Sequence, residues 1–227
     1  MRETDVLTLR DTDPRWPAQL RGLAGMPRTL YVAGDVRALS RPAVAIVGTR
    51  RVSHRAYVIA GRIARAAAER GIVVVSGLAL GVDTAAHAGA LSVPAPTVAV
   101  LAHGLHKVYP SINGEVADDI THHGALVTEH PWGADLSRQS LMLRNRITSA
   151  LARAVIVVET SPTGGAMHCA RFAHAQGRRV VVVMPADAAG IDVSGAAELM
   201  RTVGATPARS VGEVLHVIEA TATSREV

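Results

Sequence analysis

The sequence predicts an α/β fold built on a doubly wound, mostly parallel sheet. Six short apolar runs rich in β-branched residues recur along the chain from residue 42 onward. They do not alternate between apolar and polar residues, which is typical of parallel strands covered on both faces. Segments of helical length separate the runs, and this alternation indicates right-handed βαβ units. The expected strands are 42–48, 72–77, 97–102, 125–129, 154–159 and 178–185.

Helices are expected between these strands because glycine closes four of the intervening segments, at Gly71, Gly124, Gly177 and Gly204. Glycine adopts the left-handed conformation that commonly ends a helix. The fold class is therefore Rossmann-like. The expected helices are 55–70, 81–91, 112–123, 140–152, 164–176 and 194–203, with a further amphipathic helix over 213–220.

The chain is expected to hold one main domain. Residues 1–41 do not follow the repeating pattern and contain three prolines between residues 14 and 27, which predicts a small N-terminal extension packed on the core. Residues 42–220 form the expected Rossmann-like domain, and residues 221–227 are expected to be a flexible tail.

Composition narrows the function classes. With 48% hydrophobic and 19% charged residues the chain is globular, and no run approaches the 18 apolar residues of a membrane span. The N-terminal residues lack a signal-peptide pattern, and the single cysteine, Cys169, can form no internal disulfide. We therefore expect a cytoplasmic protein without a membrane partner. The net charge is +5 and Lys107 is the only lysine among 24 basic residues, so nearly every cation is a guanidinium able to bind phosphate.

The residues that follow each strand are the candidate ligand-binding residues, because ligands bind at the carboxyl ends of the strands in open α/β sheets. After the first strand comes Gly48-Thr49-Arg50-Arg51, which combines close backbone approach, a hydroxyl donor and two guanidinium groups. This combination favours an anion, although a tight turn with solvated arginines is the alternative. It contains one glycine where the dinucleotide fingerprint requires three.

The loop after the second strand contains Ser76 and Gly77 ahead of a helix start, where backbone N–H groups and the helix dipole favour phosphate. Asp83 would repel phosphate, so it is expected to cap the helix or orient the loop. His87 lies four residues later on the same helix face and is its expected partner.

Three further segments complete the set. The loop after the third strand offers Gly104 and Lys107 with two histidines and Tyr109, and is either ligand-facing or an ordinary solvated loop. Arg144 and Arg146 do not share a helix face, so one is expected to contact phosphate and the other to brace a loop or a carboxylate such as Glu159. The loop after the fifth strand offers glycine amides at a helix start. These segments contribute Gly104, Lys107, Arg144, Asn145, Arg146, Gly164 and Gly165.

Catalytic motifs are not evident. The sequence contains no GxSxG and no HExxH, and no histidine, cysteine or carboxylate falls at metal-ligand spacing. We therefore expect no enzyme activity, no metal and no cofactor.

Read together, IVGTR, SGLALGVDTAAHAGAL, LAHGLHKVYP, LRNRI, VIVVET and SPTGGAMHCARFAHAQGRRV resemble the DNA-processing protein A family (DprA, also called Smf) over about residues 10–207. The resemblance implies an extended Rossmann fold that binds single-stranded DNA as a homodimer and helps to load the RecA recombinase during natural transformation. It implies DNA contacts by Gly48, Arg50, Ser76, Gly77, Arg144 and Arg146. No helix-turn-helix pattern follows residue 220, so the winged-helix tail of some members is expected to be absent.

Two alternatives remain open. A nucleotide-binding sensor would need just one or two of the anion-binding loops. A nucleoside-monophosphate phosphoribohydrolase resembling the LOG group would need a PGGxGTxxE loop, of which Thr163-Gly164-Gly165 is a partial match without the glutamate.

Overall fold

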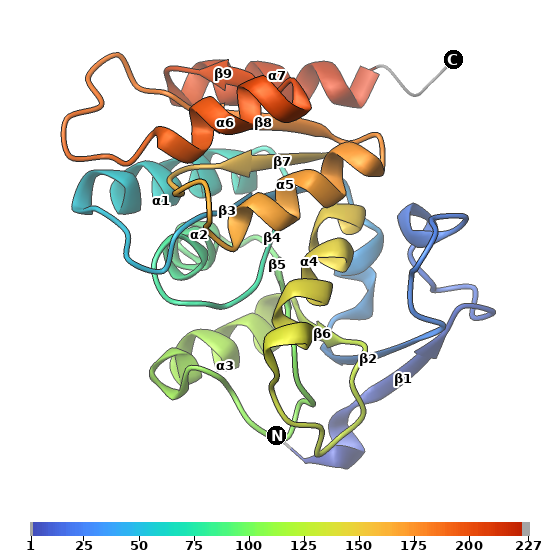
Figure 1. Ribbon diagram of the computed structural model, residues 1–227. Helices are drawn as coiled ribbons and strands as arrows, with labels where there is room; N and C mark the ends of the chain where they lie inside the picture. Colours follow the sequence, from blue (N-terminus) through green and yellow to red (C-terminus); the bar gives the residue numbers. More distant parts are fainter. Residues whose placement is uncertain (1, 224–227) are drawn as a thin grey trace.

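The structure is a computed structural model that describes residues 2–223, and the strands within them form one sheet. Its order is β1-β2-β6-β5-β4-β3-β7-β8-β9 (Figure 1). The strands from β3 to β8 pair in parallel, which confirms the α/β, Rossmann-like prediction. These six are β3 (Ala43–Val47), β4 (Val73–Ser76), β5 (Thr97–Val100), β6 (Ala125–Thr128), β7 (Ala154–Val157) and β8 (Arg179–Val183).

Helices cover both faces of the sheet, as the non-alternating strands predict. In β3, Ala45 and Val47 are buried in the core beneath α4, α5 and α6, whereas Val44 and Ile46 are buried beneath α1, α2 and α7. A third cluster joins α3 to the same face as α2. The helices are α1 (His54–Ala68), α2 (Val82–Leu91), α3 (Gly114–His123), α4 (Arg138–Leu151), α5 (Ala166–Ala175), α6 (Ser194–Val203) and α7 (Val211–Thr223).

The N-terminal residues add strands that the sequence reading did not anticipate. β1 (Leu7–Arg10) and β2 (Thr29–Gly34) form an antiparallel hairpin, and β2 also pairs antiparallel with β6 (Figure 1). At the other edge, β9 (Thr206–Ala208) pairs in parallel with β8. Short 3-10 helices lie at Glu3–Asp5, Ala18–Leu20, Val36–Ser40 and Ser111–Asn113.

Two element boundaries differ from the prediction in ways that matter. α4 begins at Arg138 rather than residue 140, because Ser137 caps it by accepting a hydrogen bond from the Ser140 amide at 2.9 Å. α7 continues to Thr223, so only residues 224–227 of the predicted tail lie outside the described residues. Within residues 2–223, no helix is both long and apolar enough to cross a membrane.

The connectivity reverses at β3, which lies between β4 and β7. The loops that follow β3 and β7 therefore leave the same edge of the sheet and run to opposite faces, toward α1 and α5. A crevice at such a reversal is where open α/β sheets bind ligands.

Candidate functional site

A groove of about 680 Å³ opens at this reversal, and we call it the arginine groove. Its floor is formed by the loops after β3, β4 and β7, and α4 and α5 form its walls. Its lining comprises 47–51, Ala79, Asp83, 138–139, 141–142, 144–145, 163–166 and 168–169.

The arginine groove carries cations that are not neutralised. Arg50, Arg51 and Arg138 are exposed, and none of the carboxylates in the described part of the chain forms an ion pair with them. Many other basic side chains are paired, as Arg55 is with Asp187 at 3.0 Å. The groove therefore presents three guanidinium groups that no carboxylate neutralises.

Arg144 is the buried member of this set, with 7% of its surface exposed. Its Nη1 donates to the Val100 carbonyl at 3.0 Å, and its guanidinium lies over the backbone of Gly77. A Cβ at Gly77 would collide with that guanidinium, so glycine is the residue that this packing permits. Burial lowers the pKa of Arg144, and the nearby Arg50 charge lowers it further while Asp83 opposes the shift. An arginine remains charged under these conditions.

Asp83 organises the loop beneath Arg144. Its carboxylate accepts hydrogen bonds from the amides of Gly77 and Ala79 at 3.2 and 3.4 Å. Burial raises the pKa of Asp83, and the Arg144 charge and the loop amides oppose that shift. The loop between these amides includes Leu78, whose φ of 57° is in the left-handed region that non-glycine residues rarely adopt. The carboxylate thus helps to hold a strained loop against the arginine.

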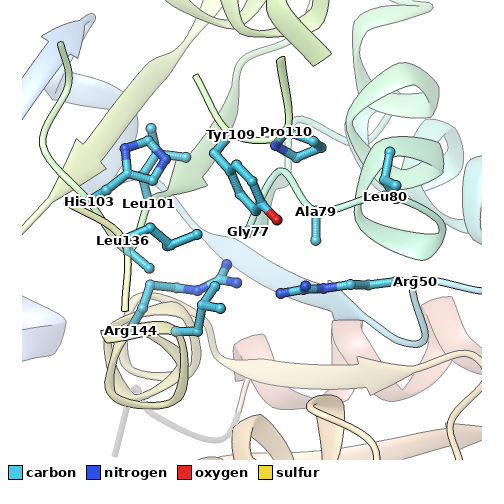
Figure 2. Close-up of a pocket in the computed structure, with 12 residues that line it drawn as sticks. Arg50, Gly77, Ala79, Leu80, Leu101, His103, Tyr109, Pro110, Leu136 and Arg144 are labelled. Atoms are coloured by element: carbon cyan, nitrogen blue, oxygen red, sulfur yellow. The ribbon is translucent and has the colours of Figure 1, made fainter. Parts of the chain in front are cut away.

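A smaller recess of about 50 Å³ adjoins the arginine groove, and we call it the tyrosine pocket. Figure 2 shows the Tyr109 ring reaching into it from one side while the guanidinium groups of Arg50 and Arg144 approach from the other. Its lining residues are Arg50, Gly77, Ala79, Leu80, Leu101, Ala102, His103, Tyr109, Pro110, Leu136, Leu141 and Arg144.

The structure brings most of the predicted site residues together. The first-strand loop, Arg144 with its neighbour Asn145, and the glycines after β7 all line the arginine groove. The Asn145 side chain donates to the Gly165 carbonyl at 3.4 Å, which links α4 to that glycine loop. The predicted residues on the groove are Gly48, Thr49, Arg50, Arg51, Asp83, Arg144, Asn145, Gly164 and Gly165, and Gly77 lines the adjoining tyrosine pocket.

Four predicted contacts lie elsewhere. Ser76 is fully buried and its hydroxyl donates to the Ile46 carbonyl at 2.7 Å. Gly104 is buried, with its amide bonded to the Ala134 carbonyl at 2.9 Å. Lys107 pairs with Asp135 beside a separate recess. Arg146 forms a bidentate pair with Glu129 at 2.7 and 2.8 Å, so the braced carboxylate is Glu129 and not Glu159.

His87 does not partner Asp83 as expected. Its Nδ1 lies 2.9 Å from the Thr97 hydroxyl, because the ring is turned toward β5 and fully buried there. Burial lowers the pKa of His87 to about 3, so the imidazole is neutral. Spacing along a helix gave the correct face but could not tell which neighbour on that face the ring contacts.

Sequence reasoning missed Arg138, Gln139 and His168, all of which line the arginine groove. Arg138 and Gln139 fell before the expected start of α4. The signal that could have found them is Ser137, a favoured capping residue directly ahead of an arginine.

Two groups in or beside the groove that could transfer protons are neutral or engaged. Burial raises the pKa of Cys169 to about 12, so its thiol is not a nucleophile at neutral pH. Glu159, below the first loop, accepts hydrogen bonds from the amides of Ser53 and Asp192 at 2.8 and 2.9 Å. Among the described residues, no cluster of histidine, cysteine and carboxylate side chains could hold a metal ion.

Comparison with known proteins bears on this arrangement. Putative DNA processing protein DprA of Mycobacterium tuberculosis is 36% identical over 202 residues, covering 83% of this chain and 52% of the relative. The chain thus spans about half the length of the curated relatives it matches. The structure of DNA processing protein A from Streptococcus pneumoniae superposes with a TM-score of 0.85 at 30% identity, covering 92% of this chain and 73% of that one.

A second solved structure is the DNA processing protein A of Helicobacter pylori, described for its single-stranded DNA binding mode. It superposes with a TM-score of 0.84 at 29% identity, covering 97% of this chain and 99% of that one. A family model for DNA recombination-mediator protein A matches residues 7–219, which include the whole arginine groove. The chain therefore belongs to the DNA recombination-mediator protein A family.

Proposed function

We propose that the arginine groove binds single-stranded DNA. The observation that carries this proposal is the convergence of Arg50, Arg51 and Arg138, exposed and without carboxylate partners in the described chain, beside the buried Arg144. Grooves that bind a single strand without sequence preference combine such cations with space to follow the backbone. The Helicobacter pylori relative, described for its single-stranded DNA binding mode, supports the same ligand.

A polyanion fits this groove better than a mononucleotide does. The loop after β3 and the glycine loop after β7 offer separate anion sites on opposite sides of the groove, and Arg138 adds a third on α4. A mononucleotide would satisfy one or two of these sites and leave the others empty. A chain of successive phosphates satisfies them together.

Binding without catalysis is part of the proposal. The Cys169 thiol is neutral, Asp83 is bonded to loop amides, and Glu129 is held by Arg146. The charged side chains that remain unpaired in the groove are Arg50, Arg51 and Arg138, which suit phosphate contacts.

We further propose, from family membership, that the protein acts as a homodimer in the cytoplasm and assists RecA loading on the bound strand during DNA uptake or recombination. Residues 42–220 would carry the strand, with residues 1–41 as an extension packed on them. The antiparallel pairing of β2 with β6 supports that packing.

The test is a binding titration with an oligo-dT and a duplex of equal length at fixed salt. We expect tighter binding of oligo-dT. Arg50→Ala and Arg138→Ala should each weaken binding and reduce the slope of log K against log salt by about 0.7, the value for one phosphate contact to a single strand. Arg201→Ala is the matched control, because Arg201 pairs with Glu198 on α6, outside the groove.

Equal affinity for the oligo-dT and the duplex would contradict the proposal, as would an unchanged salt slope in both groove variants. Millimolar AMP should not displace the oligo-dT. Displacement by AMP would favour the nucleotide sensor, and release of free base from AMP would favour the phosphoribohydrolase.

A further inference from the structure

We infer that Glu159 is the positioning residue of the arginine loop, which we define as residues 49–53 between β3 and α1. Arg50 and Arg51 lie in this loop, and Glu159 sets where their guanidinium groups stand. The inference rests on the proposed function, because its consequence is measured in the binding of phosphates by these two arginines. Glu159 does not line the arginine groove, so it acts on the ligand through the backbone of the loop.

Glu159 bonds to both ends of the arginine loop. Its backbone carbonyl accepts a hydrogen bond from the Thr49 amide at 2.7 Å, and its carboxylate accepts one from the Ser53 amide at 2.8 Å. Residues 50–52 alone lie between these two anchors, and they include both arginines. One residue at the end of β7 therefore limits the conformations that are open to Arg50 and Arg51.

The carboxylate also completes the start of α1. Ser53 is the N-cap of this helix, and its hydroxyl accepts a hydrogen bond from the Ala56 amide at 3.2 Å. In a capping box, a Glu or Gln at that third helical position accepts a hydrogen bond from the N-cap amide in return. Alanine has no such acceptor, and Glu159 supplies it from the neighbouring strand instead. The beginning of α1, and with it the end of the arginine loop, depends on this side chain.

Burial makes the orientation of the Glu159 carboxylate specific. The residue is 5% exposed, and none of the cations in residues 2–223 forms an ion pair with it. A buried carboxylate is stable only when hydrogen bonds replace its water. Its second oxygen accepts from the Asp192 amide at 2.9 Å, so each oxygen is bonded to a backbone amide. These two bonds fix the carboxylate in one orientation.

The arginine loop is confined on its inner side as well. A Cβ at Gly48 would collide with the Glu159 carbonyl oxygen, and a Cβ at Gly81 would collide with the Thr49 carbonyl oxygen. The Thr49 hydroxyl accepts a hydrogen bond from the Arg51 amide at 3.2 Å. The backbone of the loop therefore lies directly against its neighbours, and the bonds to Glu159 hold its two ends there.

Charge alone predicts the opposite effect of Glu159 on binding. A carboxylate close to an anion-binding loop repels phosphate, so its removal would strengthen binding if electrostatics were its only role. A positioning role predicts weaker binding, because the two guanidinium groups lose their fixed places. The two roles therefore differ in the sign of one measured change.

The experiment measures oligo-dT binding by Glu159→Met at several salt concentrations. Methionine fills similar space with an unbranched side chain but has no oxygen acceptor for the loop amides. We expect about tenfold weaker binding and a slope of log K against log salt reduced by about 0.7, the value for one phosphate contact. Glu213→Met is the matched control, because the Glu213 carboxylate also accepts a backbone amide, that of Arg209 at 2.9 Å, but lies outside the groove.

A second variant breaks the same bond from the other side. Ser53→Pro removes the amide hydrogen that Glu159 accepts, and proline fits the backbone there because φ of Ser53 is −65°. It should weaken oligo-dT binding about as much as Glu159→Met does. Proline also removes the capping hydroxyl, so the control is Ser53→Ala, which removes the hydroxyl alone and should weaken binding less.

A double-mutant cycle assigns the effect to the two arginines. In an Arg50→Ala/Arg51→Ala protein, Glu159→Met should cause no further loss of affinity, because no guanidinium is left in the loop to position. A further tenfold loss in that background would contradict the assignment. Wild-type or tighter binding by folded Glu159→Met or Ser53→Pro would overturn the inference and leave the proposed function standing. Wild-type binding by the Arg50→Ala/Arg51→Ala protein would overturn the proposed function as well.

Discussion

Arg144 and Gly77 form the tightest packing relation in the site, because the guanidinium occupies the space that any side chain at position 77 would need. The arginine is fixed from below by the Val100 carbonyl and electrostatically by Asp83. A buried cation held this firmly loses little conformational freedom when it meets a phosphate. At the residue scale, the absence of a side chain at Gly77 therefore lets Arg144 hold its position before a ligand binds.

Gly77→Ala should displace the Arg144 guanidinium, weaken oligo-dT binding, and lower the free energy of unfolding by about 1–3 kcal/mol through overpacking. Gly114→Ala is the control, because a Cβ at Gly114 meets no other atom within 4 Å. Urea denaturation and a binding titration measure the two effects. If the Gly77→Ala protein bound oligo-dT as tightly as the wild type, the arginine would not need its present position.

The residue scale also shows where sequence reasoning reaches its limit. Gly77 and Arg144 could be selected from the sequence as anion-binding residues and Asp83 as a residue that orients their loop, and the three do lie together. The direction in which each side chain points could not be predicted from the sequence. Arg146 is two residues from Arg144 yet faces Glu129, and Ser76 precedes Gly77 yet faces the interior, because neighbours on a helix or strand point to different sides.

At the scale of the element, α4 brings its N-terminal end and its middle to the groove. Arg138 stands in its first turn, where the helix dipole already favours negative charge and disfavours a cation. An anionic ligand relieves that conflict. The sequence predicted this helix but began it two residues late, so the arginine at its start was overlooked.

α2 is joined to the sheet by a buried imidazole, and this predicts a pH effect on stability. The pKa of His87 is about 3 in the folded protein and about 6.5 when unfolded, so the unfolded state binds the extra proton first. The contribution of the neutral His87 to the free energy of unfolding is fully present above pH 6.5 and is lost as the pH falls toward 3. At pH 5 it should lower the free energy of unfolding by about 2 kcal/mol relative to pH 7.

Urea denaturation at pH 5 and pH 7 measures this contribution. In His87→Gln the difference between the two pH values should shrink by about that amount, whereas in His174→Gln, which alters an exposed histidine on α5, it should remain as in the wild type. A wild-type pH dependence in His87→Gln would show that another group titrates.

The elements were predictable to different degrees for physical reasons. The six parallel strands are buried on both faces, so their sequences are mostly apolar and easy to find. β1 and β2 are less uniform, with burial that varies along each strand, and a long proline-containing segment separates them. β2 joins the sheet by pairing with β6, almost a hundred residues away, and no local pattern reports such a partner.

At the scale of the whole molecule, the N-terminal residues are connected to the core by more than strand pairing. Arg146 on α4 donates to the Gly25 carbonyl at 2.7 Å and pairs with Glu129, which follows β6. Both partners of the ion pair are mostly buried, with 13% and 16% of their side chains exposed. One side chain thus joins the N-terminal residues, α4 and the end of β6.

Arg146→Ala should lower the free energy of unfolding by about 3 kcal/mol, because it leaves Glu129 buried without its partner. Arg201→Ala, which breaks an exposed pair on α6, should cost less than about 1 kcal/mol. Oligo-dT affinity of the folded Arg146→Ala protein should stay within about twofold of the wild type. If Arg146→Ala instead lost affinity as Arg50→Ala does and kept the wild-type stability, Arg146 would be a phosphate-binding residue.

The strand order has a consequence for biosynthesis. β7 inserts beside β3, so the arginine groove is assembled from loops and helices that lie between residues 47 and 169. A growing chain on the ribosome can form β3, β4, β5 and β6 well before β7 exists, and until then the edge of β3 stays open and half of the groove is missing. A nascent chain should therefore be unable to capture DNA until residue 169 has been translated.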